Sequence, residues 1–178
     1  HCDGEILRRM HRPGNEETLR KTIAHIRERV PDITLRTTLI AGFPGETPAQ
    51  FEKLCAFVRQ QNFARLGCFA YSEEEGTKAA QMMQMPLAVR EQRAEAVMRI
   101  QTDHMAARQA ALVGTQAQVL CDGWDEENGL WLCRTRADAP DIDAVVCVDG
   151  NAALTPGEFY TVRIIDSDVY DLYATLAE

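Results

Sequence analysis

Apolar positions in the first 112 residues alternate between helical and strand spacings. A stripe from Leu19 to Val30 recurs every three or four residues, which predicts an amphipathic helix capped by Asn15 and ended by Pro31. The apolar run Ile33–Ile40 is rich in β-branched residues and predicts a buried strand. A second strand is expected over Phe63–Tyr71.

Helix-start signals place further helices around these strands. Asp3 can cap a short helix, and Thr47-Pro48-Ala49-Gln50 combines an N-cap, a proline at the first helical position and a reciprocal glutamine. Pro86 starts a long helix that is expected to reach about Leu112. The resulting β-α-β order predicts a parallel, right-handed unit, and such a sheet needs further strands beside it.

After Gly114 the pattern changes to short strands separated by turn residues. The expected strands are Gln116–Cys121, Leu130–Arg134, Ala144–Val148, Glu158–Ile165 and Val169–Ala174. Five short strands in this space predict a small Greek-key barrel of OB-like type. The fold class is therefore α/β plus all-β, with domains over 1–112 and 113–178.

Charge separates the same two parts. Of the 178 residues, 46% are hydrophobic and 26% charged, which is ordinary for a globular protein. Residues 1–112 carry 16 basic against 14 acidic residues (+2), whereas 113–178 carry 3 against 13 (−10), which together give the net charge of −8. So acidic a domain repels phosphate backbones and suits a basic partner, although an acidic surface that only aids solubility is the alternative.

No apolar run approaches the roughly 18 residues of a membrane span, and no charged-then-apolar leader opens the chain. A cytoplasmic protein without a membrane partner is expected. Because His1 is not methionine and directly precedes a helical pattern, the natural protein is expected to begin upstream.

The cysteines show no C-x-x-C or cluster spacing, so no zinc or iron–sulfur site is assigned to them. They are interpreted as small hydrophobic residues without disulfides. They are Cys2, Cys55, Cys68, Cys121, Cys133 and Cys147. The histidines within helical segments, His11, His25 and His104, are expected to face solvent or pack rather than bind metal.

The most specific local pattern is Thr38–Thr47, in which a buried strand passes through a Gly-Pro-Gly turn into a capped helix. Ligands of α/β sheets bind at the carboxyl ends of strands, where glycines allow close approach to the backbone. On this pattern alone, a turn that binds no ligand is the simpler interpretation.

Thr38–Thr47, together with Phe69–Thr77 after the next strand, resembles the paired late-barrel signature of radical-SAM methylthiotransferases. His1 with Ile6–Gly14 resembles the segment that precedes it. Within this branch, Arg12-Pro13-Gly14 and Arg134–Asp143 resemble the RimO family rather than its tRNA-modifying MiaB relatives. The similarity spans nearly the whole chain.

The resemblance implies the carboxy-terminal portion of a radical-SAM partial TIM-like barrel followed by a TRAM β-barrel. It implies S-adenosylmethionine and two 4Fe-4S clusters in the parent protein. The reaction implied is cleavage of S-adenosylmethionine to a 5'-deoxyadenosyl radical, hydrogen abstraction from the β-carbon of an aspartate in ribosomal protein S twelve, and insertion of a methylthio group there. The residues implied near the adenosyl moiety are Gly42, Phe43, Pro44, Gly45, Glu46 and Tyr71.

This chain departs from the family pattern in lacking the C-x-x-x-C-x-x-C cluster loop and the amino-terminal domain. No catalytic residue or cluster ligand is therefore assigned, and the chain alone is expected to be inactive although its parent should be active. The acidic barrel is expected to bind ribosomal protein S twelve rather than RNA. The alternatives are a tRNA methylthiotransferase of the MiaB-like branch and a non-catalytic acidic barrel that binds a basic protein.

Overall fold

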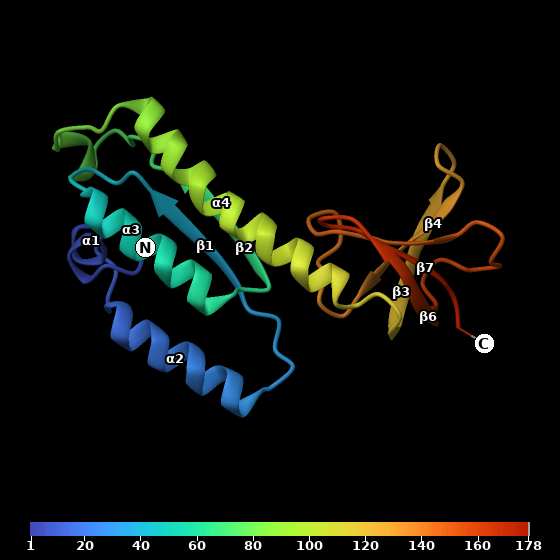
Figure 1. The fold of residues 1–178 in the computed structure, drawn as a ribbon. Helices are drawn as coiled ribbons and strands as arrows, with labels where there is room; N and C mark the ends of the chain where they lie inside the picture. The colour runs from blue at the N-terminus through green and yellow to red at the C-terminus, as the bar shows by residue number, and fades with distance from the viewer. Residues whose placement is uncertain (178) are drawn as a thin grey trace. The chain divides into compact units, whose positions relative to one another are not determined.

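The computed structural model describes residues 1–177, which form two compact units, His1–Thr102 and the residues from Asp103 onward. The chain is an α/β portion followed by a closed five-stranded β-barrel, as the sequence predicts (Figure 1). The first unit contains α1 (Gly4–Arg9), α2 (Glu16–Arg29), β1 (Arg36–Ala41), α3 (Pro48–Gln61), β2 (Arg65–Ala70) and η1 (Ala79–Gln81). The long helix α4 (Leu87–Ala110) continues from this unit into the second.

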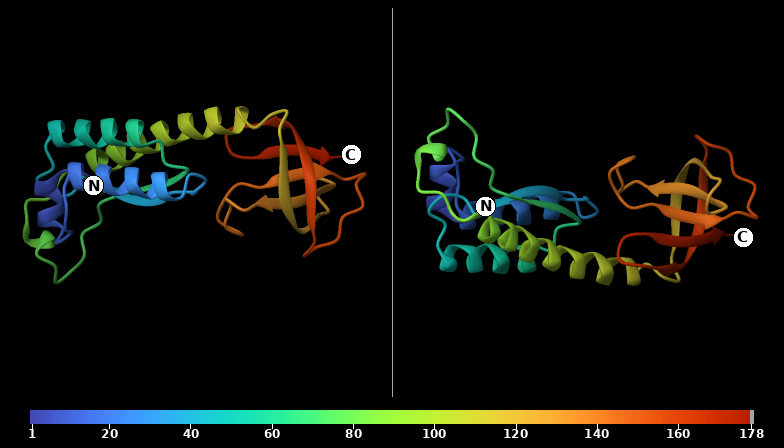
Figure 2. Two further views of the ribbon diagram at one scale, coloured as in Figure 1. Left: turned by 90° about the horizontal axis from the view of Figure 1, so that it is seen from below. Right: turned by 90° about the horizontal axis from the view of Figure 1, so that it is seen from above.

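Strands β1 and β2 form a parallel two-stranded sheet in which Leu39 pairs with Cys68 and Ile40 with Phe69. Helices α3 and α4 lie over the same face of this sheet, as the views in Figure 2 show. Leu39 and Leu66 on that face pack into a core with residues of both helices, including Leu54 and Val97. The expected parallel β-α-β unit is confirmed.

The capping signals act as the sequence predicts. Asp3 accepts the N–H groups of Glu5 and Ile6 at the start of α1. Asn15 and Thr47 each form a capping box, with Thr18 and Gln50 as their reciprocal partners. Local side-chain chemistry therefore fixes where these helices begin.

Strand β1 begins three residues later than expected. The N–H of Ile33 donates to the carbonyl of Val30 at 3.1 Å, which closes a turn over Pro31 and Asp32. This turn keeps Ile33 out of the sheet, so the strand starts at Arg36. Helix α4 likewise ends at Ala110, because the following residues form a turn before Gly114.

The second unit is a closed barrel with the strand order β3-β4-β5-β7-β6. Its strands are β3 (Gln116–Asp125), β4 (Leu130–Thr135), β5 (Val146–Asp149), β6 (Phe159–Ser167) and β7 (Leu172–Leu176). All neighbouring pairs are antiparallel except β5 and β7. This order, in which the third strand pairs with the fifth, is consistent with the expected OB-like barrel.

Strand β7 starts at Leu172 rather than Val169 because Asp168 forms a turn first. Its Oδ1 accepts the N–H groups of Tyr170 and Asp171, each at 2.7 Å. These hydrogen bonds lower the pKa of Asp168, since they stabilise the ionised carboxylate.

The barrel core is filled by inward residues of all five strands, including Val119, Cys133, Val148 and Ile164. Cys121 and Cys133 pair across β3 and β4 and are almost fully buried. Burial raises the pKa of Cys133 to about 12, so its side chain remains a neutral thiol. Within the described part of the chain all six cysteines are free thiols.

Within residues 1–177 no helix is long and apolar enough to cross a membrane.

Candidate functional site

The turn between β1 and α3 lies at the carboxyl end of the sheet and brings together the sequence-predicted residues Gly42–Glu46. Gly42 has φ 76° and Gly45 has φ 80°, a region that favours glycine. A Cβ at Gly42 would meet atoms of Arg90 on α4 at 2.7 to 2.8 Å. Glycine is therefore needed at position 42 for both its backbone conformation and the close approach of α4.

The buried side chain of Glu46 stabilises this turn by hydrogen bonding. Its side chain is fully buried; Oε2 accepts the N–H of Gly42 at 3.0 Å, and Oε1 accepts from Arg93 of α4 at 2.6 Å. Arg93 also donates to the backbone carbonyl of Glu46 at 2.9 Å. A buried carboxylate requires such partners, because burying an unpaired charge is costly.

His1 completes the buried group around Glu46. Its Nδ1 accepts the N–H of Asp3 at 3.0 Å, so a neutral ring carries its proton on Nε2. Nε2 lies 3.3 Å from Oε2 of Glu46, and both side chains are inaccessible to solvent. The imidazole therefore lies beside the carboxylate that fixes the turn, but its buried Nε2 makes no hydrogen bond with the described residues.

Tyr71 stands directly after β2, beside the turn. Its ring packs edge-on against Phe43, with centroids 5.2 Å apart. Its backbone N–H donates to Ala41 and its carbonyl accepts from Arg90, each at 2.8 Å. Its hydroxyl is buried and has no hydrogen-bond partner among the described residues, which is unusual for a buried polar group.

The sheet face opposite α3 and α4 is exposed. Ile40 and Phe69 are adjacent in the parallel register and are 40% and 65% exposed. Thr38, which is exposed, pairs with Gly67 on the same face, and a Cβ at Gly67 would meet nothing within 4 Å. In a parallel sheet, both faces are normally covered by other elements. The exposed apolar area on this face therefore leaves room for further protein or for a ligand.

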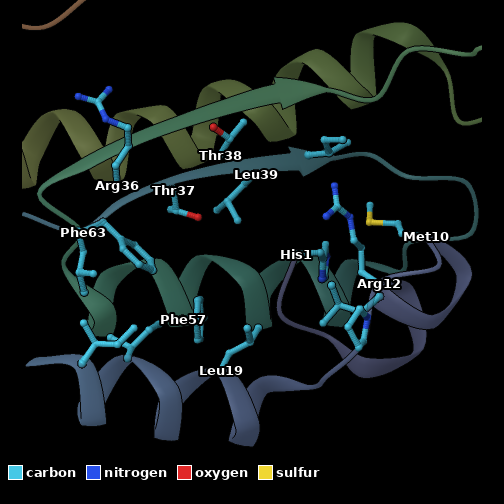
Figure 3. A pocket seen from close by; sticks show the side chains of 16 residues that line it. His1, Met10, Arg12, Leu19, Arg36, Thr37, Thr38, Leu39, Phe57 and Phe63 are labelled. Atoms are coloured by element: carbon cyan, nitrogen blue, oxygen red, sulfur yellow. The ribbon is translucent and has the colours of Figure 1, made fainter. Parts of the chain in front are cut away.

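A separate cleft of about 580 Å³ runs along the edge of β1 that pairs with no other described strand. Figure 3 shows it between β1 and helices α2 and α3, with His1 and Arg12 near one end and Arg36 and Phe63 near the other. Its other lining residues are largely apolar. None of the six sequence-predicted residues lines this cleft, although His1 links it to Glu46.

The structure adds three residues that the sequence analysis did not assign to the site. Arg90 and Arg93 reach the turn from α4, more than 40 positions away in the chain, and no local pattern marks them. The contact between His1 and Glu46 was not predicted from the sequence either.

Among residues 1–177 no group of three or more histidine, cysteine or acidic side chains could hold a metal ion. Burial raises the pKa of Cys2 to about 11 and that of Cys68 to about 12. Both side chains are therefore neutral thiols near pH 7.

Comparisons with known proteins give the chain two sets of relatives. Residues 113–176 match the family model of the TRAM domain. The whole chain resembles proteins named ribosomal protein uS12 methylthiotransferase RimO: it is 42% identical over 176 residues to that of Hydrogenovibrio crunogenus and 44% identical over 178 residues to that of Burkholderia pseudomallei. These matches cover 98% and 97% of the chain but 38% of each relative. The chain thus spans about two fifths of the length of the curated relatives that it matches.

Proposed function

Since the chain belongs to the RimO family, of which it is a carboxy-terminal portion with a TRAM domain, we propose that the complete enzyme is a radical-SAM methylthiotransferase. Its substrate would be ribosomal protein uS12, also called S twelve, which it would modify at the β-carbon of an aspartate. Acting on a ribosomal protein, the enzyme would work in the cytoplasm.

The observation that carries this proposal is the exposed apolar face of the β1–β2 sheet. Ile40 and Phe69 are exposed there, and Gly67 leaves space beside them. The buried hydroxyl of Tyr71 lies unpartnered among described residues at the carboxyl end of β2. An apolar surface with a few convergent polar groups at strand ends is typical of a cofactor site.

These features fit the adenosyl group of S-adenosylmethionine. The backbone of the turn Gly42–Gly45 and the hydroxyl of Tyr71 would supply polar contacts, while Phe43 and Pro44 are buried and shape the turn. Glu46 would act indirectly, because its carboxylate is already engaged by Gly42 and Arg93. The cluster ligands would come from other parts of the complete enzyme, since the described residues offer no metal-binding group.

When bound, the cofactors would supply the hydrogen-abstracting radical and the sulfur chemistry. The residues of this chain would orient the adenosyl group and exclude water from it. Without cluster ligands the chain by itself would not methylthiolate uS12.

The cleft along β1 fits a further strand of the complete sheet. It follows the unpaired edge of β1, and its apolar lining comes from α2, α3 and the strand itself. An added parallel strand would satisfy the backbone groups of this edge and cover the apolar lining.

The acidic barrel suits a basic protein substrate. Residues 113–178 carry 3 basic against 13 acidic residues, so long-range attraction favours a basic ribosomal protein over an RNA backbone. A tRNA substrate, the alternative within this branch, would be repelled by the same charge.

The experiment is equilibrium binding of S-adenosylmethionine to the complete, cluster-loaded enzyme. Phe69→Asp should weaken binding by about tenfold or more, because it places a charge on the apolar sheet face. Ile142→Asp is the matched control, since Ile142 is 76% exposed in the barrel unit. Equal affinity of the Phe69→Asp and unaltered enzymes would exclude this face as the cofactor site.

A further inference from the structure

The parallel pairing of β1 and β2 ends where the two strands separate at their carboxyl ends. Its last hydrogen bond runs from the N–H of Tyr71 to the carbonyl of Ala41 at 2.8 Å. In a parallel ladder the next bond would run from the N–H of Phe43 to the carbonyl of Tyr71. That bond is not formed, because Gly42 has φ 76° and turns the chain away from β2. Tyr71 is largely buried, so its carbonyl needs another donor.

Arg90 of α4 supplies this donor. Its Nη1 donates to the carbonyl of Tyr71 at 2.8 Å. Its Cα, Cβ and Cγ lie against Gly42, where an added Cβ would meet them at 2.7 to 2.8 Å. One side chain therefore lies against the ends of both strands at the point where they separate.

The guanidinium of Arg90 is otherwise poorly satisfied. It pairs with no carboxylate of residues 1–177, and its buried Nε has no hydrogen-bond partner there. An arginine with an unpaired buried donor contributes little net stability, because the lost hydration of that N–H is not replaced. Stability alone therefore does not explain the presence of an arginine at this position.

Arg90 approaches the strand ends from the covered side of the sheet. Helix α4 lies over that side (Figure 2), whereas Ile40 and Phe69 are exposed on the other. A group bound on the exposed face would contact the turn and Tyr71 without contacting Arg90. The arginine can act on such a group only through the positions of these residues.

We propose that Arg90 is a positioning residue, which keeps the ends of β1 and β2 apart so that the turn Gly42–Gly45 and Tyr71 can both contact the adenosyl group. The inference rests on the proposed function, in which that group binds on the exposed face of the sheet. Without the guanidinium, the next donor in ladder register for the carbonyl of Tyr71 is the N–H of Phe43. The strands then pair one step further, which draws the turn towards Tyr71.

The first measurement follows this pairing in the 178-residue chain without any cofactor. Arg90→Met removes the donor but keeps an apolar stem against Gly42, whereas Arg90→Lys keeps a donor. The NMR coupling across a hydrogen bond from the Phe43 nitrogen to the Tyr71 carbonyl carbon should be absent in the unaltered chain and in Arg90→Lys, and present in Arg90→Met. Arg99→Met, which removes an exposed arginine of the same helix, should leave this coupling absent.

The second measurement is equilibrium binding of S-adenosylmethionine to the complete, cluster-loaded enzyme. Arg90→Met should weaken binding by about tenfold, the effect of losing one well-placed hydrogen bond. Arg90→Lys should stay within about threefold of the unaltered affinity, because the site uses a single donor rather than a bidentate fork. Arg99→Met should stay within about twofold, and thermal melts would verify that all three variants fold.

The outcomes separate this inference from the proposed function. Failure of the unaltered enzyme to bind S-adenosylmethionine, or full affinity in Phe69→Asp, would contradict the proposed cofactor site and this inference with it. Binding that is lost in Phe69→Asp but kept in Arg90→Met would overturn only the role of Arg90. The same conclusion would follow if Arg90→Met showed no coupling between Phe43 and Tyr71, or if Arg90→Lys lost as much affinity as Arg90→Met.

Discussion

The carboxylate of Glu46 accepts the backbone N–H of Gly42 at 3.0 Å and so closes the turn that joins β1 to α3. The same carboxylate pairs with Arg93 of α4 and faces His1. One buried side chain therefore connects a strand end, a helix start and two distant segments. The shape of the candidate cofactor site depends on this connection.

Glu46→Gln should destabilise the first unit by about 3 kcal/mol, because the buried guanidinium of Arg93 loses its charged partner. Urea unfolding followed by far-ultraviolet circular dichroism measures this loss. Glu52→Gln is the matched control, since Glu52 lies exposed on α3. A loss no greater than that of the control would show that Glu46 does not hold the turn.

Gly42→Ala should cost more stability than Gly76→Ala. Both glycines have positive φ, 76° and 80°, so each substitution carries about 1–2 kcal/mol of backbone strain. Only at Gly42 would the new Cβ also meet α4, whereas nothing lies within 4 Å at Gly76. Comparison of the two free energies of unfolding isolates the cost of this clash, and equal values would contradict the close approach of α4.

Cys2 and Cys133 should resist alkylation by iodoacetamide at pH 8 in the folded protein. Both side chains are 0% exposed, and burial raises their pKa to about 11 and about 12, so neither accessible surface nor thiolate is available. Both should react once urea unfolds the chain. Peptide mass mapping after a timed reaction checks this, and rapid labelling in the native protein would contradict the burial of these thiols.

Asp168→Asn should destabilise the barrel at pH 7 but have little effect in acid. The folded pKa of Asp168 is lowered from the ordinary 3.8, so its contribution is present above that value and is lost as the pH falls through the folded pKa. Thermal melts from pH 7 to pH 2 should therefore show a difference between variant and unaltered protein that shrinks below about pH 4. Glu126→Gln in the β3–β4 loop serves as control, and a pH-independent difference would show that ionisation of Asp168 does not stabilise the turn.

The elements that sequence patterns predicted best are those with local chemical signals. Thr47, Pro48 and Gln50 marked the start of α3 correctly because the cap involves residues within one helical turn. The predicted start of β1 was too early, because the pattern of apolar residues does not reveal the turn in which the N–H of Ile33 donates to the carbonyl of Val30.

The candidate site was predictable only in part for the same reason. Gly42, Gly45 and Glu46 lie in one short segment of the chain. Arg90 and Arg93 lie on α4, and the position of this helix depends on tertiary packing. The contact between His1 and Glu46 joins residues 45 positions apart, so no spacing rule could supply it. The outward position of Phe159 likewise follows from the strand register of the barrel, which the residue type alone does not indicate.

The most direct test of uS12 methylthiolation by the complete enzyme is the mass of uS12 from cells that lack the enzyme and from the same cells supplied with it. We predict that uS12 gains one methylthio group in place of hydrogen on an aspartate only when the complete enzyme is present, and that tRNA is unchanged. Unmodified uS12 in both samples, or methylthiolation of tRNA instead, would contradict the account.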